Sequence, residues 1–175
     1  MAAVMVSRQG RELQRYSDST GGRIVVGCVP YRVRESDGGV EVLVISSQKK
    51  GAAGGVLLPK GGWELDESME EAATREAMEE AGVSGEVAGP ALGVWWYRSR
   101  SYDATYEGIV LPLRVTRVME RWPEMGARRR EWVEPAEAVA RCHHAWMREA
   151  IQRFVDLRSI HGANAAETAL LGSAL

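Results

Sequence analysis

Runs of apolar residues divide the chain into a small number of elements before any chemistry is considered. The runs Ile24-Val25-Val26-Gly27-Cys28-Val29 and Val40-Glu41-Val42-Leu43-Val44-Ile45 are rich in β-branched residues, which favour strands. The first of these strands is predicted to extend over residues 23–33. Since the strong turn sequence Asp37-Gly38-Gly39 lies between the two runs, they are predicted to pair as a hairpin.

The clearest helix is predicted over residues 68–81. Ser68 and Glu71 have the spacing of a capping box, and acidic residues fill the first turn, where the helix dipole favours them. Gly82 is a typical helix stop. The helix carries a narrow stripe of small or apolar residues, which are Met69, Ala72, Ala73, Ala77 and Ala81. Such a stripe lets the helix backbone pack close against a sheet.

The remaining pattern predicts a mixed α/β fold in one domain. Gly51 to Gly55 is predicted to be a flexible loop, and strands are expected over residues 87–97 and 106–118. A short helix is expected to begin near Pro135, and a final helix is expected over residues 144–157. We therefore divide the chain into an N-terminal extension (1–21), partly irregular, a main domain (22–158) and a flexible C-terminal tail (159–175).

Composition limits the classes to which the chain can belong. Its 175 residues are 45% apolar and 26% charged, which fits one globular domain with a sizeable core. No apolar run approaches the ~18 to 20 residues of a membrane span, and the N-terminus lacks the pattern of a secretory signal. Cys28 and Cys142 form neither a disulfide framework nor a metal-ligand spacing. A membrane partner is therefore not expected.

Charge is distributed unevenly along the chain. The segment 64–80 contains one base, Arg75, and eight acids, which are Glu64, Asp66, Glu67, Glu70, Glu71, Glu76, Glu79 and Glu80. This segment carries −7, and because the net charge is −2, the other residues sum to +5. An acidic block within a basic remainder suits a protein that holds cations and a polyanion together, although a solvated helix face has the same composition.

Three glutamates at helical spacing indicate a site for cations. Glu76 is separated from Glu79 and Glu80 by three and four residues, so the three carboxylates lie on neighbouring positions of one helical face. Three like charges so close together repel one another, and bound cations would relieve the repulsion. Carboxylate oxygens suit Mg²⁺ or Mn²⁺, which commonly bind through a few carboxylates together with substrate phosphates.

The segment from Gly61 to Val83 resembles the Nudix box, a 23-residue pattern of which eight of the nine specified positions are met. The departure is Ala77, where the family usually has a larger aliphatic residue. The resemblance implies the Nudix fold, a mixed β-sheet sandwiched between helices. It also implies hydrolysis of a diphosphate by water that attacks phosphorus, with Mg²⁺ or Mn²⁺ as the cofactor.

The resemblance also implies a role for each matched residue. Catalysis and metal binding are expected of Glu76, Glu79 and Glu80, with a further metal ligand from the backbone carbonyl of Lys60. Arg75 is expected to pair with Glu67 and orient the helix, while Gly61, Gly62 and Gly82 serve the path of the backbone. The base that activates the water stays open at this point, and the candidates are Glu76, Glu80 and, outside the box, Glu124, Glu131 and Glu134.

The flanking sequences 43–47, 59–64 and 130–132 resemble the diphosphoinositol polyphosphate phosphohydrolase branch of the family, particularly its plant members. This resemblance implies inositol pyrophosphates and diadenosine polyphosphates as substrates. The basic residues expected to contact substrate are Arg15, Lys49, Lys60, Arg100 and Arg130, together with His144, which stands where relatives have lysine. Nearby candidates are Arg23, Lys50, Arg98 and Arg128.

Other interpretations of the sequence remain open. An ADP-ribose, nucleotide-sugar or oxidised-nucleotide hydrolase would use Trp95, Trp96 and Tyr97 to stack a base, although alternation along a strand directs at least one of these rings into the core. A non-catalytic polyphosphate-binding module is the alternative from another class. The expected partner is a small polyanionic phosphate, with capped RNA as a minor substrate and no other nucleic acid. We expect a monomer in the cytoplasm or nucleus, with a mitochondrial or plastid address left open.

Overall fold

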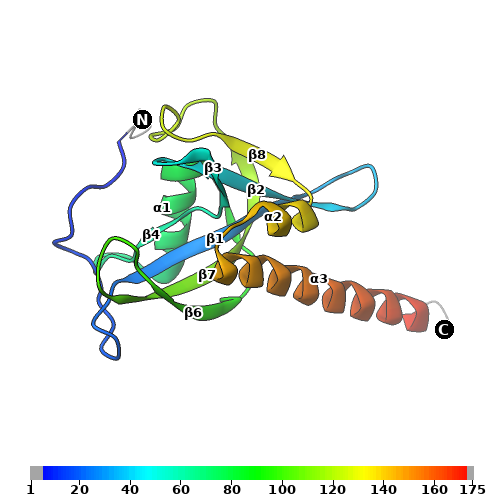
Figure 1. Cartoon of the computed structure of the whole chain (residues 1–175). Coiled ribbons are helices and arrows are strands. Elements are labelled where there is room, and N and C mark those ends of the chain that lie inside the picture. Colours follow the sequence, from blue (N-terminus) through cyan, green and yellow to red (C-terminus); the bar gives the residue numbers. More distant parts are fainter. Residues whose placement is uncertain (1–5, 173–175) are drawn as a thin grey trace.

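The computed structural model describes residues 6–172 and contains one mixed sheet of eight strands between helices (Figure 1). The strands are β1 (Ile24–Val33), β2 (Val40–Ser47), β3 (Gly51–Leu57), β4 (Lys60–Gly62), β5 (Val83–Val87), β6 (Gly93–Arg98), β7 (Thr105–Val118) and β8 (Arg130–Val133). The helices are α1 (Met69–Ala81), α2 (Pro135–Arg141) and α3 (Ala145–Gly172). The expected fold class, a mixed sheet flanked by helices, is confirmed.

The sheet is mixed because its central strands run in both directions. Its main path has the order β3-β2-β1-β7-β5, in which β1 pairs with β7 in parallel and with β2 antiparallel. The pairing of β1 with β2 confirms the predicted hairpin. Outside this path, β4 pairs with β1, β6 with β7 and β8 with β2. The pairing of β4 with β1 brings Lys60 opposite Gly27, so the start of the acidic segment lies against the middle of the sheet.

Strand β2 shows how the sheet forms two hydrophobic cores. Its residues Val42 to Ile45 are all buried, and successive side chains point to opposite faces. Val42 and Val44 join the core that is covered by α2 and α3, whereas Leu43 and Ile45 join the core that is covered by α1. A continuous apolar run is therefore required at this position, because the strand is buried on both sides.

Helix α1 has the predicted ends and the predicted stripe of small residues. Ser68 forms the capping box with Glu71, and Gly82 ends the helix in the left-handed conformation with φ 64°. The alanines at positions 72, 73, 77 and 81 are fully buried against β1, β2 and β7. Because these side chains are small, the helix lies close to the sheet, and its glutamates are held near the sheet edge.

Three of the predicted elements were wrong in extent. Gly51 to Gly55 belongs to strand β3 and is not a loop, because pairing with β2 imposes an extended conformation on the small residues. The strand expected over 87–97 is two strands, interrupted at Gly89 and Pro90, where Gly89 has φ 142° and Pro90 lacks an N–H. The last helix continues from Ala145 to Gly172 (Figure 1), since the alanines and leucines after residue 158 favour helix.

The two ends of the chain differ in how they contact the domain. Residues 6–22 are largely irregular but are tied to the domain by bridges from Gln14 to Glu64 and from Tyr16 to Arg23. The flexibility predicted for 159–175 stays a prediction, and residues 1–5 and 173–175 lie outside the described part. None of the helices between residues 6 and 172 has the length and apolar character that a membrane crossing requires.

Candidate active site

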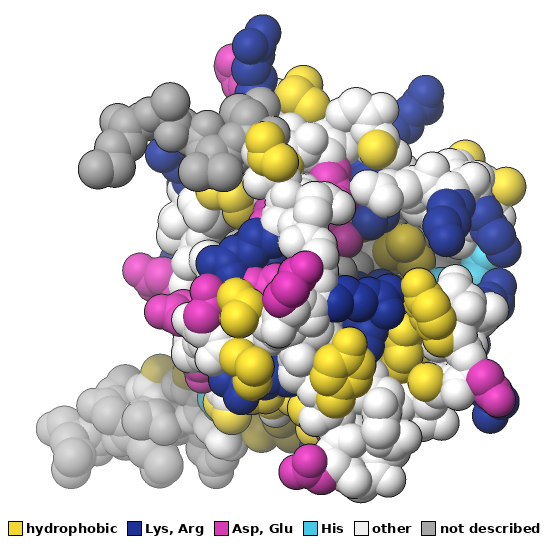
Figure 2. All heavy atoms as spheres, turned by 90° about the vertical axis from the view of Figure 1, so that its left-hand side faces the viewer, with side chains coloured by type: hydrophobic (Ala, Val, Ile, Leu, Met, Phe, Trp, Pro, Cys, Tyr) yellow, Lys and Arg dark blue, Asp and Glu magenta, His cyan; other side chains and the backbone are white. Residues whose placement is uncertain are grey.

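The three expected glutamates lie in one small cavity. Glu76, Glu79 and Glu80 are only 6%, 8% and 8% exposed, although all three are acidic. The cavity has a volume of about 270 Å³ and lies among α1, β4, the starts of β1 and β7, and the N-terminal segment. Its other lining residues include Ser7, Arg8, Gln14, Arg23, Lys60, Tyr97, Tyr106 and Glu124. On this side of the molecule, basic side chains lie directly beside acidic ones (Figure 2). We call this hollow the carboxylate cavity.

Each glutamate in the carboxylate cavity accepts hydrogen bonds from a different part of the chain. Glu76 Oε1 accepts from Arg75 Nη1 at 2.8 Å, and Glu79 Oε1 accepts from the backbone N–H of Arg8 at 3.2 Å. Glu80 accepts from the backbone N–H of Lys60 at 3.0 Å and from Arg128 Nη2 at 2.9 Å. The carboxylates are therefore held in place by protein donors on several sides.

Arg75 joins the loop before α1 to the helix itself. Its Nε and Nη2 donate to the two oxygens of Glu67 at 2.9 and 2.6 Å, so the pair expected from the sequence is present in bidentate form. Nη2 also donates to the carbonyl of Gly62 at 3.0 Å. The guanidinium thus ties Glu67, β4 and Glu76 into one rigid unit, as the orienting role of Arg75 requires.

Gly61 and Gly62 are needed for close approach rather than for an unusual φ. A Cβ at Gly61 would overlap the Glu76 carboxylate, and one at Gly62 would overlap the side-chain oxygen of Gln14. Neither glycine has a positive φ. The backbone of β4 can therefore lie directly against Glu76 because Gly61 lacks a side chain, and against Gln14 because Gly62 lacks one.

Burial shifts the proton equilibria of the clustered acids. Burial and the neighbouring Glu80 charge raise the pKa of Glu76 to about 8, against the opposing charge of Arg75. Burial also raises the pKa of Glu80 and of Glu79, even though Arg128, Lys60 and the N–H of Arg8 lower them in part. Arg75, Arg128, Lys60 and Arg8 thus compensate the repulsion among these acids only in part. A bound cation would compensate the rest.

The types of ligand atom in the carboxylate cavity suit Mg²⁺ or Mn²⁺, but the positions of these atoms in the described part of the structure do not form a metal site. Carboxylate oxygens and a backbone carbonyl are the ligands that these ions prefer. Within residues 6–172, however, no three acidic, histidine or cysteine side chains are grouped so that they could hold a metal ion. The reason is visible in the contacts, because Arg75 and Arg128 occupy oxygens of Glu76 and Glu80. Metal binding therefore requires these side chains to turn, and the carbonyl role of Lys60 stays a prediction.

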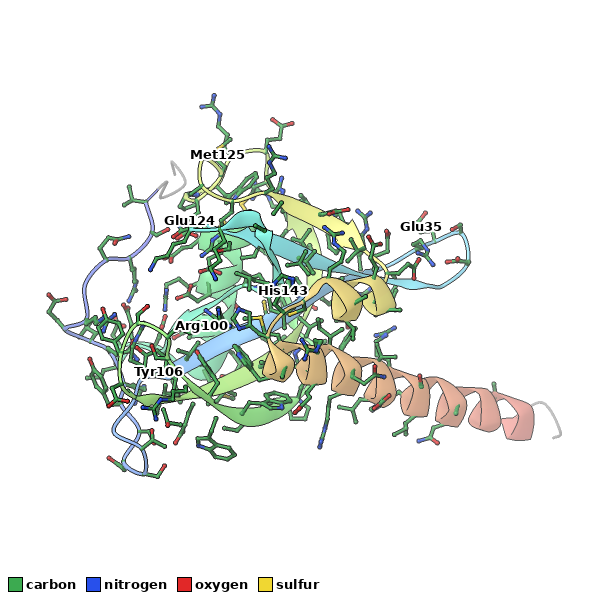
Figure 3. The ribbon with its side chains drawn as sticks, in the orientation of Figure 1. Glu35, Arg100, Tyr106, Glu124, Met125 and His143 are labelled. Carbon is green, nitrogen blue, oxygen red and sulfur yellow. The ribbon has the colours of Figure 1, made fainter. Side chains whose placement is uncertain are left out.

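One of the three glutamates considered outside the box reaches the carboxylate cavity. Glu124, in the loop between β7 and β8 (Figure 3), accepts from Arg128 Nε at 2.6 Å and from Ser7 Oγ at 3.3 Å. Glu131 and Glu134 are instead paired at the surface with Arg141 and Arg34. Among these outside candidates, only Glu124 is positioned to act on a water molecule in the cavity.

Part of the expected basic set converges beside the carboxylates. Lys60 lines the carboxylate cavity, and Arg100 lies in the loop between β6 and β7 (Figure 3). Burial, followed by the charges of Lys60 and Arg100, lowers the pKa of His144, and His143 and Lys50 add to the effect. These five residues therefore form a basic cluster. Lys49 is exposed in the adjacent turn between β2 and β3.

Arg130 has structural contacts, although it also belongs to the lining of the larger hollow described below. Its Nη1 donates to the carbonyls of Ala81 and Gly82 at 2.9 and 3.1 Å, and its guanidinium stacks 3.9 Å from the centroid of the Trp122 ring. It therefore caps the C-terminal end of α1, where a cation is favoured by the helix dipole. Arg128, two residues earlier in the loop before β8, is the arginine of this run that contacts Glu80 and Glu124, and the expected contact of Arg130 with substrate stays a prediction.

Arg15 likewise has structural contacts, and its expected contact with substrate stays a prediction. Its Nε and Nη2 donate to the carbonyls of Glu64 and Leu65, each at 3.2 Å, and its guanidinium lies 4.5 Å from the centroid of the Trp63 ring. The side chain therefore fastens the N-terminal segment to the loop after β4.

Two residues of the N-terminal segment reach the site without any signal in the sequence. The Arg8 guanidinium forms ion pairs with Glu64 and Asp66, and the Gln14 amide is buried beneath β4. Both lie in an irregular polar segment, so neither periodicity nor motif spacing distinguishes them. Only the contacts in the folded structure identify Arg8 and Gln14 as part of the site.

A second hollow, of about 850 Å³, lies next to the carboxylate cavity. Its lining is drawn from β2, β3, the loop before β8 and the segment after α2, and includes Ser46, Ser47, Gln48, Gly51, Gly55, Met125, Arg128, Arg129, Arg141 and His143. We call it the basic groove. Arg128 joins the two hollows, because it lines the groove while it binds Glu80 and Glu124 of the cavity and the carbonyl of Ser46.

The aromatic run in β6 is split between the two faces of the sheet, as expected from strand alternation. Trp95 packs against the core beneath α3 and donates to Glu149 at 2.9 Å, while Tyr97 is stacked 4.7 Å from Trp146. Trp96 points to the other face and is 60% exposed. The two tryptophans therefore do not form a shared surface for a nucleotide base.

Comparison with known proteins agrees with this architecture. Residues 22–154 match the NUDIX domain. Nudix hydrolase 21, chloroplastic, of Arabidopsis thaliana is 52% identical over 87% of this chain and 75% of its own length. Diphosphoinositol polyphosphate phosphohydrolase 3-alpha of Mus musculus is 35% identical over 74% of this chain and 76% of its own length. In fold, the chain is similar to a C. elegans Ap4A hydrolase in a binary complex, with a TM-score of 0.60, 19% identity and coverage of 78% and 97% of the two chains.

Proposed function

The chain belongs to the NUDIX family of hydrolases, and we propose that it cleaves the diphosphate bonds of inositol pyrophosphates and of diadenosine polyphosphates. The observation that carries this proposal is the junction of two charged hollows. Buried glutamates line one of them, and basic residues from two separate segments, Arg128 to Arg130 and Arg141 with His143, line the other. The names of the mouse relative and of the C. elegans neighbour point to the same two classes of substrate.

Glu76, Glu79 and Glu80 are proposed to hold Mg²⁺ or Mn²⁺, together with the carbonyl of Lys60. When bound, such ions lower the pKa of the attacking water, polarise the phosphoryl oxygens and stabilise the leaving phosphate. Arg75 keeps Glu76 in position through its bidentate pair with Glu67. Arg128 holds one oxygen of Glu80 and must release it for the full ligand set to form.

Glu124 is proposed to take the proton from the attacking water. With the three box glutamates assigned to metal, Glu64 and Glu124 are the carboxylates that remain in the lining of the cavity, and Glu64 is paired with Arg8. Arg128 and Ser7 each donate to one of its oxygens, which orients the carboxylate. A carboxylate held in this way is a suitable base for water bound at hydrogen-bond distance.

The basic cluster and the basic groove are proposed to bind the phosphates that are not cleaved. Inositol pyrophosphates carry dense negative charge and no base, so arginine and lysine are the side chains that would recognise them. Lys60 lines the cavity and, with Arg100, is close to His144, whereas His143, Arg128, Arg129 and Arg130 line the groove. A polyphosphate that spans both hollows would place one diphosphate bond beside the glutamates.

A nucleotide-sugar, ADP-ribose or oxidised-nucleotide substrate is the second candidate. Tyr97 and Tyr106 line the carboxylate cavity, and this is the observation that favours it. Tyr97 already stacks on Trp146, however, and Trp96 points to the other face of the sheet. The aromatic groups at the cavity are therefore fewer than the sequence had suggested.

A substrate panel with Mg²⁺ tests the proposal. Purified protein is assayed on an inositol pyrophosphate, diadenosine polyphosphates, capped RNA and ADP-ribose, with Glu80→Gln as the inactive reference. We expect the highest kcat/KM on the inositol pyrophosphate or a diadenosine polyphosphate. Faster turnover of ADP-ribose would contradict the proposed substrate, and turnover by Glu80→Gln equal to that of wild type would contradict the site.

Two further proposals concern the oligomeric state of the protein and its location in the cell. We propose a monomer that acts on a small polyanion, which size-exclusion chromatography with light scattering would test. The name of the Arabidopsis relative includes the word chloroplastic, which favours an organelle over the cytoplasm or nucleus expected from the sequence. Imaging of a fluorescent fusion in plant cells would distinguish these locations.

A further inference from the structure

The carboxylate cavity contains one arginine that no acid neutralises. Arg8, Arg75 and Arg128 each form ion pairs with carboxylates around this cavity. Arg23 lines the same cavity, but across the described residues no carboxylate lies within ion-pair distance of it. Its Nε instead donates to the side-chain oxygen of Gln14 at 2.9 Å.

The orientation of the Gln14 amide is set by the surrounding backbone. The residue is only 7% exposed, and its Nε2 donates to the carbonyls of Arg15 at 2.6 Å, Ile24 at 3.0 Å and Trp63 at 3.4 Å. Because carbonyls only accept, the NH₂ side of the amide must face them. The oxygen of Gln14 must then face Arg23, and Gly62 leaves the space that this oxygen occupies.

An amide at this position has a different electrostatic effect from a carboxylate. Both accept a hydrogen bond and orient the guanidinium, but the amide is neutral and leaves the positive charge of Arg23 uncompensated. Arg23 also lies 5.7 Å from the centroid of the Tyr106 ring, and its charge opposes the burial that raises the pKa of Tyr97. The guanidinium therefore lies beside the pair of tyrosines that line the cavity.

We propose that Gln14 is a positioning residue that directs Arg23 into the carboxylate cavity with its charge free to bind a phosphate of the substrate. The proposal rests on the function proposed above, because it assumes that an anionic substrate enters the cavity. The essential feature is that Gln14, which holds Arg23, is neutral. Gln14 itself does not contact the substrate and acts only through Arg23.

A double-mutant cycle tests the proposal. The variants are Gln14→Met, which removes the acceptor and keeps the length of the side chain, Arg23→Met, and the combination of the two. Binding of inositol hexakisphosphate, which has no diphosphate bond to cleave, is measured by calorimetry in EDTA. We expect Arg23→Met to weaken binding about 10-fold or more and Gln14→Met about 3- to 10-fold. The double variant should bind no more weakly than Arg23→Met, because the effect of Gln14 passes through Arg23.

Two further variants separate positioning from general support of the fold. Gln14→Glu retains an acceptor for Arg23 but adds a negative charge and loses the NH₂ that donates to three carbonyls, so it should weaken binding more when Arg23 is present than when it is methionine. Gln9→Met changes an exposed glutamine of the same segment and should bind as wild type does. Circular dichroism and thermal unfolding verify that each variant is folded. If Gln14→Met does not fold, the cycle is carried out with Gln14→Glu.

Kinetics on the best substrate of the wild-type panel complete the test. We expect Gln14→Met to raise KM by the same factor that it weakens binding, with kcat within about twofold of wild type. Unchanged binding and KM in the Gln14 variants, or an equal effect with and without Arg23, would overturn the role of Gln14. Failure of the wild type to bind inositol hexakisphosphate would overturn the proposed substrate instead, and the cycle would then be measured through KM.

Discussion

The carboxylate cavity and the basic groove are neighbours of opposite character. The cavity, of about 270 Å³, draws its proposed metal ligands from one helix and the adjoining strand β4, within twenty-one residues of sequence from Lys60 to Glu80. The groove, of about 850 Å³, combines residues 44–56, 125–131 and 141–143. In the proposed function the cavity performs the reaction and the groove selects the substrate. The chemistry is thus encoded locally, whereas selection depends on segments that only the fold brings together.

Arg128 and Arg130 show the same contrast at the scale of two residues. Arg128 connects the groove to Glu80 and Glu124, whereas Arg130 binds the carbonyls at the end of α1. Both belong to one run of three arginines, and in the sequence they are equivalent cations. Their contacts differ because Arg128 lies in the loop before β8 whereas Arg130 is the first residue of that strand.

The largest effect is expected from the cavity itself. Glu80→Gln removes a proposed metal ligand while it preserves size, so kcat should fall about 10³-fold or more. The protein should remain folded, because the change also removes a buried charge beside Glu76. Steady-state assays with Mg²⁺ measure the loss, and Glu70→Gln, an exposed acid of the same helix, serves as the control. Comparable activity in the two variants would contradict the assignment.

A smaller effect is expected where the two hollows meet. Arg128→Met should reduce kcat/KM about 10- to 100-fold, because Glu124, Glu80 and the Ser46 carbonyl all lose a donor. Kinetics on an inositol pyrophosphate would detect this loss. An unchanged kcat/KM would show that the hollows function independently.

Arg130→Met is expected to affect stability rather than turnover. Loss of its hydrogen bonds to Ala81 and Gly82 should lower the free energy of unfolding by about 1–3 kcal/mol. Urea unfolding measures the change, and activity per folded molecule should stay within about twofold of wild type. A loss of kcat/KM as large as that in Arg128→Met would restore Arg130 as a substrate contact.

The stability of the metal-free protein should depend on pH through the buried glutamates. Because the pKa of Glu76 is raised in the folded state, the folded protein binds its proton more tightly than the unfolded chain does. Stability in EDTA should therefore decrease as pH rises from about 4.5 to about 8, with Tm falling about 2–4 °C for each kcal/mol lost. Added Mg²⁺ should recover more stability at pH 8 than at pH 5. A flatter profile is expected for Glu76→Gln, and an identical profile would exclude this residue as the cause.

The smallest effect is expected at the exposed aromatic residue of β6. Trp96→Ser should change kcat/KM less than about twofold, because this ring points away from the packing of Trp95 and Tyr97. The substrate panel measures the change. A larger loss, confined to ADP-ribose or another nucleotide, would favour the second candidate function.

Much of the fold followed from local patterns. The hairpin of β1 and β2, the capping box of α1 and the stop at Gly82 are short-range features, and all three were predicted. The errors came where neighbours override local preference. Pairing with β2 makes a strand of the glycine-rich β3, and Gly89-Pro90 interrupts a run whose side chains alone favour one strand.

The sequence alone determined the acidic helix, its small-residue face and the spacing of its three glutamates, because a helix repeats every 3.6 residues and places them together wherever it is packed. It could not determine which arginine, glutamate or glutamine from elsewhere would reach them. Gln14, Glu124 and Arg128 enter the site through contacts between distant segments, such as the hydrogen bond from Ser7 to Glu124, which joins residues 117 positions apart in sequence. Only the packing of the sheet, loops and N-terminal segment decided those contacts, because the direction of each side chain depends on the register and turns that precede it.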